Sequence, residues 1–565
     1  MLRETLVRRR LARGKRTYIL AVDVKNAFST TNREAQMYEL RRLGESEGIW
    51  TYSDSTYSNT WTVLKNGKNY SNLIKESKGS KQGGIKSATD YKSYNKPLFE
   101  MIETSNLGIK EKGTSYGSIM VADDGLSLME DLEDVRQIGR IYTAFSETYS
   151  VTFCFDKTIL NVVGSEEDKI ELEKSGIKIG GVDPHFDSNS IHIGLVMSED
   201  TGSTERLNVE YRIKKVKETA YGYLKNIIWD QRNRPTLETR LKLYESIVRP
   251  ILLSGLSALK LNPEDKREII NLEHELLRGI LGVRARTSMN IIYKLTGQIP
   301  ILGHLDSATL SILHNIWSRP ENPLHGLIKD SSTDSEGRNT LAREANSVLI
   351  KYKMPPIHEL FELRCPEKEG WKNHKKKLIQ EYWEEDVQNK IDTMITARFC
   401  GPKKVKLDKK VANSLAETHT QRDITSTKYM LDIMSDNLEH GDQLKRRGKE
   451  DSNKCNKCDV KDTTEHALFC PGMEDDYGVK SAATHFESLV LPMLTQSTAE
   501  QYKTDPTTKI SIILHALDFI QLSQEQSQNQ SSTQVSDSEK LTESSDLTAK
   551  VKRDINFAQR KLTTQ

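Results

Sequence analysis

Two short apolar runs that each end in carboxylates constrain this chain more than any other feature. The run Tyr18–Val22 leads to Asp23 within AVDVKNAF, and the run Ile119–Ala122 leads to Asp123 and Asp124 within IMVADDGLSL. Apolar runs of about four to eight residues bounded by turn signals are typical of buried strands. Two strands of one sheet can bring such acids together, and clustered carboxylates then need cations. Mg²⁺ suits oxygen ligands of this kind, and two Mg²⁺ ions can clamp an in-line phosphoryl transfer.

Each acid also has an ordinary interpretation. Asp-Gly is a common turn dipeptide, so Asp123–Gly125 can be a plain hairpin turn, and Asp23 can be a loop or capping residue. The order of the neighbouring features favours a shared site. Phe28 follows Asp23, the small-residue segment GSKQGG at 79–84 opens a predicted helix, and Asp156-Lys157 follows the second acidic pair.

The first 200 residues alternate predicted strands with predicted helices. The dipeptide Asn66-Gly67 predicts a hairpin turn, and apolar spacing predicts helices over 87–103 and 132–149. Two further strand-like runs follow at 151–155 and 158–163.

Beyond about residue 205 the pattern becomes helical. Apolar residues recur at three- and four-residue spacing and predict a bundle of about 100 residues. The predicted buried faces contain Ile213, Val216, Ala220 and Leu224, then Leu241, Tyr244, Ile247 and Val248, then Ile269, Leu272, Leu276, Leu277 and Ile280. We expect helices to continue to about residue 440. Ser, Gln and Glu dominate the end of the chain, which predicts disorder there.

Composition restricts the class of protein. With 565 residues, the chain is long enough for about three to four domains. No apolar run reaches about 18 residues, and the N-terminal stretch MLRETLVRRRLARGKR has no apolar core. We therefore expect an intracellular protein of the nucleus or cytoplasm, neither secreted nor membrane-spanning and with no membrane partner.

The distribution of charge along the chain is more informative about partners than the net charge is. Because 82 basic residues nearly cancel 80 acidic ones, the net charge is only +2. The basic residues cluster at 8–16, 372–377, 403–410 and 445–449. Such clusters are usually solvated faces, but they also suit contacts with nucleic-acid phosphates.

Three of the six cysteines fall within sixteen residues, in CNKCDVKDTTEHALFC. Cys455, Cys458, His466 and Cys470 have the spacing C-x2-C-x7-H-x3-C, which is typical of a closed, structural zinc site. Metal binding would supply folding free energy to a segment too small to bury its own core. The alternative is that reduced cysteines lie near one another by chance. Cys154, Cys365 and Cys400 are interpreted as isolated structural thiols.

Taken in order, these motifs resemble the palm of a reverse transcriptase, an RNA-directed DNA polymerase, of the non-LTR retrotransposon type. AVDVKNAFST resembles the first catalytic motif, GSKQGG the template- and nucleotide-contacting motif, and VADDGLSL the Asp-Asp motif. FCFDKTILNVVG resembles the next motif, HIGLVM is similar to the primer-grip hairpin, and the helices over 223–283 are similar to the thumb. The resemblance covers about residues 17–300, and more loosely the chain to about 475.

The resemblance implies roles for the acidic residues and the aromatic that follows the first of them. Asp23 and Asp123 would bind two Mg²⁺ ions, and Asp124 would complete the acidic cluster. Phe28 would be a steric gate that excludes a ribose 2′-hydroxyl; its alternative is a buried core aromatic.

Three further residues would contact substrates. Gln82 and Gly83 would lie near the template base and the incoming nucleotide, although a loop before a helix is an equal interpretation. Lys157 would lie near the triphosphate as a general acid, although a lone lysine is more often a solvated surface residue.

The implied fold is α+β, with an antiparallel palm sheet and packed helices. We expect a palm at 1–200 with the endonuclease and most of the fingers missing, and a helical thumb at 201–300. A helical C-terminal region at 301–445, a CCHC zinc segment at 446–475, a helical tail at 476–520 and a mostly disordered tail at 521–565 would follow.

The implied function is two-metal transfer of deoxynucleotides onto a primer 3′-hydroxyl, with an RNA template, a DNA primer and dNTPs as partners, in a chain that resembles a truncated copy. The competing hypothesis is a catalytically inactive nucleic-acid-binding zinc protein derived from such an element. A lesser alternative is a domesticated interaction protein. The sequence does not give the oligomeric state.

Overall fold

The computed structural model describes residues 2–81, 83–111, 113–121, 124–228, 235–333, 341–394, 445, 452–455, 457–463, 466 and 470. The chain divides into two compact units. The first contains Met1–Arg212, Ser254–Asp265 and Ala308–Lys368, and the second contains Ile213–Leu253, Lys266–Ser307 and Glu369–Gln565. Each unit is described by itself.

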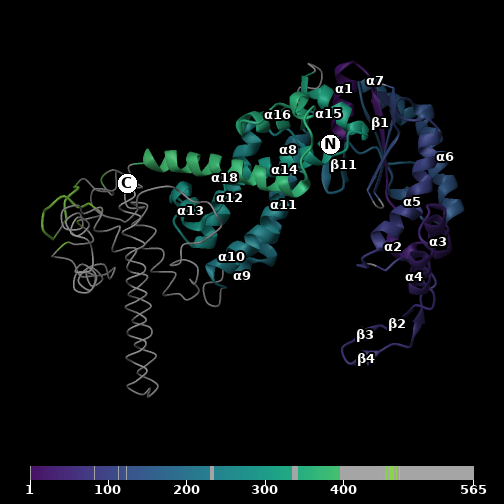
Figure 1. Ribbon diagram of the computed structural model, residues 1–565, viewed down its shortest axis with the longest axis horizontal. Helices are drawn as coiled ribbons and strands as arrows, with labels where there is room; N and C mark the ends of the chain where they lie inside the picture. The colour runs from purple at the N-terminus through teal and green to yellow at the C-terminus, as the bar shows by residue number, and fades with distance from the viewer. Residues whose placement is uncertain are drawn as a thin grey trace. The chain divides into compact units, whose positions relative to one another are not determined.

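A four-stranded antiparallel sheet forms the centre of the first unit (Figure 1). Its strand order is β10 (Ile159–Val163), β1 (Thr17–Val22), β9 (Asp124–Met129) and β8 (Ser118–Val121). Side chains alternate between the two faces of β1, as its apolar composition requires. Tyr18, Leu20 and Val22 belong to one buried cluster, whereas Ile19 belongs to another.

Helices cover both faces of this sheet. On one face, α5 (Ser87–Thr104) and α6 (Leu132–Tyr149) bury Leu98, Ile102, Ile138, Tyr142 and Phe145 in the cluster that holds Tyr18. On the other face, α1 (Leu2–Ala12) and α15 (Pro323–Thr333) contribute Leu6, Val7 and Leu327 to the cluster that holds Ile19. This is an α+β unit of the expected kind, with an antiparallel sheet and packed helices.

The basic cluster at 8–16 is largely neutralised inside the first unit. Arg8 pairs with Glu205 at 2.8 Å, and Arg9, buried, pairs with Glu111 at 3.3 Å. Three more pairs in this cluster are Arg10 with Glu130, Arg13 with Glu111 and Arg16 with Asp168. The interpretation of this cluster as a solvated or phosphate-binding face was wrong for Arg8, Arg9 and Arg10, which are buried against carboxylates, whereas Arg13 and Lys15 are exposed.

The first unit also contains smaller elements outside the four-stranded sheet. The helices are α2 (Ala27–Thr30), α3 (Arg33–Arg42), α4 (Glu47–Tyr57), α7 (Glu166–Lys174), α16 (Leu341–Lys351) and α17 (Ile357–Leu360), with short 3₁₀ turns at Phe155–Lys157 and Leu256–Ala258. The strands are β2 (Trp61–Thr62), β3 (Lys65–Asn66), β4 (Asn69–Tyr70), β5 (Ile74–Lys75), β6 (Ile109–Glu111), β7 (Thr114–Tyr116), β11 (Asn189–His192) and β12 (Leu195–Ser198).

Two local predictions in this unit need correction. The run 151–155 is not a strand, because Phe153 makes only an isolated bridge to Val24 before the chain turns into the 3₁₀ segment. The hairpin predicted at Asn66-Gly67 exists, but Asn66 pairs with Asn69, so residues 67 and 68 form the turn.

Up to Asp392, the secondary structure that the second unit's described residues form is helical. Its elements are α9 (Lys225–Ile228), α10 (Leu237–Leu243), α11 (Arg249–Leu253), α13 (Met289–Thr296) and most of α12 (Pro263–Leu281) and α18 (Lys368–Asp392), with π-helical turns at Glu218–Tyr223 and Tyr244–Val248. Helices α8 (Thr204–Lys217) and α14 (Ile301–Trp317) contain residues of both units. The predicted apolar faces are buried at Val216, Ala220, Leu241, Val248 and throughout the set on α12.

Several sequence predictions lie outside the described residues. These are Gln82, Asp123, Cys400, the basic cluster at 403–410, most of the cluster at 445–449, and the tails at 476–520 and 521–565. Among the helices that the structure describes, none combines the length and apolar character needed to cross a bilayer.

Candidate functional site

The sheet register places two of the predicted acidic residues at the same end of neighbouring strands. Strand β1 pairs with β9 so that Val22 faces Gly125. Asp23 directly follows Val22, and Asp124 directly precedes Gly125. Residues that are far apart in the sequence therefore converge at one edge of the sheet.

The β8–β9 hairpin positions Asp124. Val121 pairs with Asp124, so only residues 122 and 123 connect the two strands. This turn is tighter than expected, because Asp124 belongs to a strand and not to the loop. Asp124 is half-buried, whereas Asp23 is exposed. Asp123 is one of the two connecting residues and lies outside the described part of the chain.

His192 is a neighbour of Asp124 to which sequence reasoning gave no role. It is the last residue of β11, is buried, and its Nε2 has no hydrogen-bond partner among the described residues. Burial lowers the pKa of His192, and the negative charge of Asp124 opposes that shift. The sequence did offer one indication of a role, because His192 begins the segment HIGLVM. In the structure this segment runs from the end of β11 into β12, and the two strands pair as a hairpin.

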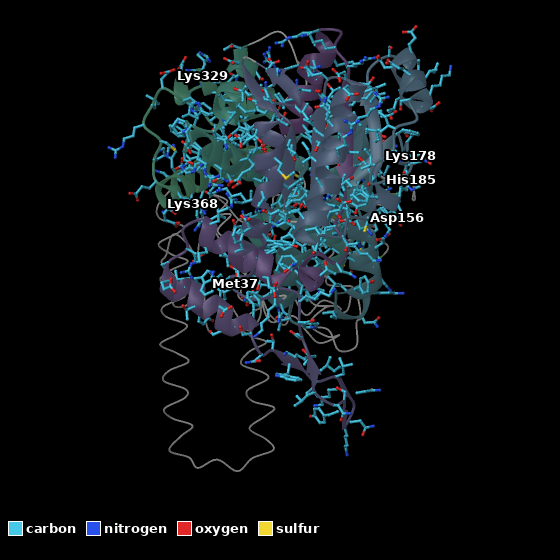
Figure 2. All side chains as sticks on the ribbon, turned by 90° about the vertical axis from the view of Figure 1, so that its right-hand side faces the viewer. Met37, Asp156, Lys178, His185, Lys329 and Lys368 are labelled. Carbon is cyan, nitrogen blue, oxygen red and sulfur yellow. The ribbon has the colours of Figure 1, made fainter. Side chains whose placement is uncertain are left out.

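Backbone hydrogen bonds link Asp23 to Lys157. The Cys154 N–H donates to the Asp23 carbonyl oxygen at 2.8 Å, and the Lys157 N–H donates to the Cys154 carbonyl oxygen at 2.9 Å. Burial raises the pKa of the Cys154 thiol, and Asp23 raises it further. Lys157 is exposed in its 3₁₀ turn. The neighbouring Asp156 is tied to His185, whose ring donates to the Asp156 carbonyl oxygen at 2.8 Å (Figure 2).

Phe28 and the glycine-containing loop are joined to each other. The Phe28 ring is half-buried and stacks on Tyr91 with 4.8 Å between ring centroids. The Ser80 N–H donates to the Phe28 carbonyl oxygen at 2.6 Å. Gly79 has φ +93°, and a Cβ at this position would lie 2.7 Å from the Ser29 carbonyl oxygen. Gly79 is therefore the position in GSKQGG where a glycine is sterically required.

Gly83 differs from Gly79 in its surroundings. Its φ is +81°, but an added Cβ would meet no atom within 4 Å. Gly83 is exposed, and among the described residues none fills the space beside it.

The donor set at the sheet edge suits a hard cation. The carboxylates of Asp23 and Asp124 form no ion pair with any residue that the structure describes. Hard divalent cations such as Mg²⁺ prefer carboxylate oxygens and keep several water ligands, which an open edge allows. These two residues would hold such an ion.

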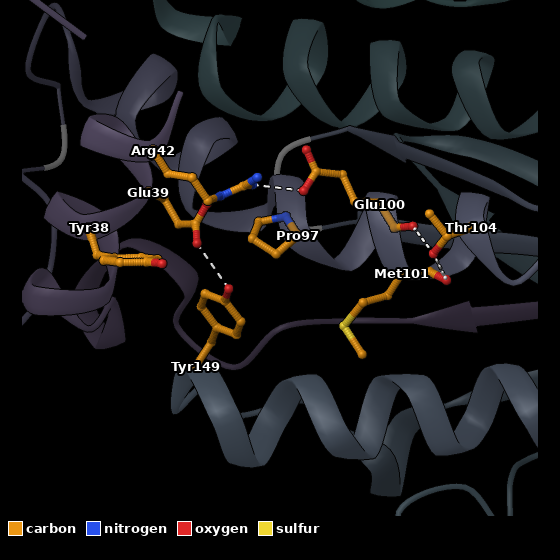
Figure 3. Close-up of a pocket in the computed structure, with 8 residues that line it drawn as sticks. All are labelled: Tyr38, Glu39, Arg42, Pro97, Glu100, Met101, Thr104 and Tyr149. Atoms are coloured by element: carbon orange, nitrogen blue, oxygen red, sulfur yellow. Dashed lines mark hydrogen bonds and ion pairs between the residues drawn. The ribbon is translucent and has the colours of Figure 1, made fainter. Parts of the chain in front are cut away.

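A surface hollow of about 340 Å³ lies elsewhere, among α3, α5 and the end of α6 (Figure 3). Its lining includes Glu39, which accepts a hydrogen bond from the Tyr149 hydroxyl at 2.9 Å, and Arg42, which pairs with Glu100 at 2.8 Å. It contains none of the site residues predicted from sequence, so the hollow is separate from the carboxylate edge.

The four predicted zinc ligands come together in the second unit. Their donor atoms all lie within 4.8 Å of one another. Cys470 Sγ is 3.8 Å from Cys455 Sγ and 3.7 Å from Cys458 Sγ, and Cys458 Sγ is 3.1 Å from His466 Nε2. Ligand atoms about 2.0–2.3 Å from a tetrahedral zinc would be separated by about 3.3–3.8 Å. This cluster therefore has the composition and spacing of a zinc site.

A tight turn pre-forms part of this cluster. The Asp459 N–H donates to the Cys455 carbonyl oxygen at 2.9 Å, and Asp459 has φ +59°. The Lys457 N–H donates to Cys455 Sγ at 3.4 Å, and this bond is the main reason why the pKa of Cys455 falls to about 6. Thiolate character is what a metal ligand requires.

Comparisons with known proteins assign no family to the chain. No protein-family model matches it, and no curated protein matches its sequence. Similar solved structures include telomerase from Candida albicans in complex with a fragment of telomeric RNA. That match has a TM-score of 0.30 and 14% sequence identity, and it covers 65% of this chain and 54% of the telomerase chain. The match to apo telomerase from Candida tropicalis has a TM-score of 0.30 and 14% sequence identity, and it covers 66% of this chain and 56% of the telomerase chain.

A third structure is apo telomerase from Candida tropicalis truncated from its C-terminal domain. It gives TM-score 0.26 and 12% identity, over 35% of this chain and 38% of that chain. The matches thus span about half or less of each telomerase chain. At TM-scores this low, the comparison does not establish a shared fold.

Proposed function

We propose that this chain is a reverse transcriptase of the non-LTR retrotransposon type, which transfers deoxynucleotides onto a primer 3′-hydroxyl. The observation that carries the proposal is the convergence of Asp23 and Asp124 at the same end of the adjacent strands β1 and β9. A sequence motif alone would allow these acids to be unrelated turn residues. Their common edge is what a two-metal polymerase needs.

The surrounding residues support the same proposal. The loop at 79–81 is hydrogen-bonded to the Phe28 backbone, and Lys157 is linked to Asp23 through Cys154. These contacts connect the GSKQGG loop to the segment that follows Asp23, and the Asp156-Lys157 turn to Asp23 itself. Phe28 is only half-buried although it packs against the core and stacks on Tyr91, so part of the residue is accessible to a nucleotide sugar.

The reaction would proceed by in-line displacement. The primer 3′-hydroxyl loses its proton to solvent, its oxygen attacks the α-phosphorus of a dNTP to form a new O–P bond, and the bond from the α-phosphorus to the bridging β-phosphate oxygen breaks to release pyrophosphate. Mg²⁺ bound at this edge would activate the hydroxyl and neutralise charge on the leaving group. Asp23, Asp123 and Asp124 would hold the ions, Phe28 would exclude a 2′-hydroxyl, and Gln82 and Gly83 would lie beside the template base and the nucleotide. Lys157 would donate a proton to the pyrophosphate.

Primer extension tests this proposal. A labelled DNA primer on an RNA template, with dNTPs and Mg²⁺, should be extended by the unaltered chain. Asp23→Asn, Asp123→Asn and Asp124→Asn should each reduce extension by at least about 100-fold, since each removes a metal-binding charge. Asp183→Asn is the matched control, because Asp183 is an exposed acid of the same unit that pairs with Lys178 at 3.6 Å. Extension that survives the change at Asp23 or Asp124 would reject the assigned site.

A second candidate function is that of a catalytically inactive zinc protein that binds nucleic acid. The observation that favours it is the Cys455, Cys458, His466 and Cys470 cluster, which needs no intact polymerase site. Absence of extension, combined with salt-sensitive binding of RNA or DNA, would support this candidate over the first.

A further inference from the structure

A projecting β-hairpin arm, residues 60–76, is the part of the first unit that the proposed function leaves unexplained. Figure 1 shows it beyond the end of α4, at the labels β2, β3 and β4. It consists of two short ladders. Trp61 and Thr62 pair with Lys75 and Ile74, and Lys65 and Asn66 pair with Tyr70 and Asn69.

Arg33 fixes the root of the arm. Its guanidinium donates to the carbonyl oxygens of Tyr57, Glu76 and Gly79 at 2.7, 2.7 and 2.8 Å, and to the Thr60 hydroxyl at 2.8 Å. One side chain thereby ties both strands of the arm to the loop that contacts Phe28. The arm therefore extends from a fixed point next to the candidate site.

The side chains of the arm are unusually apolar for an exposed element. Trp61 is 52% exposed and Tyr70 is 66% exposed. The aliphatic side chains Val63, Leu64, Leu73 and Ile74 are exposed as well. Because these side chains are exposed on a short hairpin, they are not part of a hydrophobic core. Stability of the fold therefore does not explain why they are apolar.

Lysines accompany these aromatic rings. Residues facing each other across an antiparallel ladder project from the same face, which puts Trp61 with Lys75 and Tyr70 with Lys65. The Lys65 ammonium lies 5.5 Å from the centre of the Tyr70 ring. From Thr60 to Lys81 the chain has five lysines and one acidic residue, Glu76.

Glu76 does not neutralise the arm lysines. It accepts a hydrogen bond from the Thr62 hydroxyl and pairs with Arg33 at 3.3 Å, and these contacts lower its pKa. Lys65, Lys68 and Lys75 form no ion pair with a residue that the structure describes. Three cationic side chains of the arm are thus available to an anionic partner.

We propose that the arm binds a single strand of nucleic acid, with bases stacked on Trp61 and Tyr70 and phosphates beside Lys65, Lys68 and Lys75. Stacking platforms interleaved with cations are how proteins hold single strands without reading their sequence. This inference rests on the proposed function only in that both take nucleic acid as partner.

A binding assay tests the proposed role of the arm. Fluorescence anisotropy measures the affinity of the full chain for a fluorescein-labelled 20-nucleotide oligo(dT), without dNTPs or added Mg²⁺. Trp61→Ala with Tyr70→Ala should weaken binding by about tenfold or more. Replacing Lys65, Lys68 and Lys75 by Gln should weaken binding and make the slope of log affinity against log salt shallower by about 2, since each phosphate contact contributes about 0.7.

Matched controls use exposed residues elsewhere in the same unit. Tyr52→Ala removes another exposed tyrosine, and Lys92→Gln, Lys110→Gln and Lys174→Gln together remove three exposed lysines. Both controls should leave affinity and salt slope unchanged. Equal losses in the arm and control variants would show a general charge or surface effect and overturn the proposal.

Ultraviolet cross-linking locates the strand directly. With 5-iodouracil in the oligonucleotide, the cross-linked peptide should contain Trp61 or Tyr70. Cross-links exclusively outside 60–81 would overturn the proposal. The proposal would also be overturned if the arm variants bound oligo(dT) normally but no longer bound anionic lipid vesicles, or no longer self-associated in sedimentation experiments. Because the assay needs neither catalysis nor Mg²⁺, its result does not depend on primer extension, so failure of the polymerase proposal and failure of the arm are distinguishable.

Discussion

Two glycines of the GSKQGG segment differ in what a methyl group would meet, and this difference is measurable. Both have positive φ, but only the Cβ of Gly79→Ala would lie 2.7 Å from a backbone oxygen, that of Ser29. Gly83→Ala should lower the free energy of unfolding by about 1 kcal/mol, because alanine is disfavoured in a left-handed backbone conformation. Gly79→Ala should lower it by about 2 kcal/mol more, because the backbone must also shift. Urea midpoints of the two variants test this. Equal shifts would show that the loop relaxes freely at Gly79.

Glu273 gives the second unit a predicted pH dependence. It is fully buried on α12, and this burial raises its pKa from 4.5 to about 7. It accepts hydrogen bonds from the Tyr293 hydroxyl at 2.6 Å and the Ile301 N–H at 3.0 Å, and Tyr244 and Arg249 lie near it. The folded state therefore holds a proton that the unfolded state releases at lower pH.

The sign follows from this difference in proton binding. Between pH 4.5 and 7 the folded state binds more protons, so the contribution of Glu273 is fully present below pH 4.5 and is lost as pH rises through 7. Glu273→Gln cannot ionise, so its stability relative to the unaltered chain should rise by about 2–3 kcal/mol from pH 5 to pH 8. Urea unfolding at the two pH values measures this. A relative stability that is independent of pH would contradict the assignment of a neutral Glu273.

At the residue scale, the sequence indicated candidates but not their surroundings. Asp23 and Asp124 could be predicted because apolar strands lead to them. The role of Arg33 at the root of the arm could not, since its acceptors come from two segments, 57–60 and 76–79, that are distant from it in sequence. The same reason explains the error at 8–16. Nothing in the local sequence shows that Glu111, Glu130 and Asp168 will surround those arginines.

The cysteine–histidine segment is the element whose prediction depends on a metal. We expect about one zinc per chain, because four ligand atoms within 4.8 Å form a closed set. Cys455→Ser with Cys458→Ser should remove that zinc and increase proteolysis of the segment, since binding supplies its folding free energy. Elemental analysis and limited proteolysis measure the two effects.

A cysteine outside the cluster provides the control. Cys365 lies in the first unit, and burial raises the pKa of its thiol. Cys365→Ser should leave the zinc content at one per chain. Unchanged zinc in the double variant would refute the assignment, and zinc loss in Cys365→Ser would show that the cluster is not the binding site.

The long helices could be predicted closely from sequence, whereas not every short strand-like run forms a strand. The helices predicted at 87–103 and 132–149 match α5 and α6 within one residue, because many turns contribute to the apolar period. The run 151–155 has strand composition, but its backbone pairs only at Phe153 and then tightens into a turn. Short runs carry too little periodicity to show whether a partner strand is present.

At the scale of the whole molecule, the sequence pattern suggested contiguous domains, and those boundaries remain predictions. The two compact units each contain three separate segments of the chain. Such interleaving leaves no local signal, because periodicity records which residues are buried and not which segments pack together.

Separate cores predict separate unfolding steps. The core around Tyr18 belongs to the first unit and the α12 core around Glu273 to the second, so calorimetry should show more than one transition. Gly79→Ala should lower the transition of the first unit alone, and Glu273→Gln at pH 8 should raise that of the second alone. Hydrogen exchange in α5 and α12 assigns the transitions to the units. A single transition, with equal calorimetric and van't Hoff enthalpies and moved by both substitutions, would show instead that the interleaved chain makes the two cores one cooperative structure.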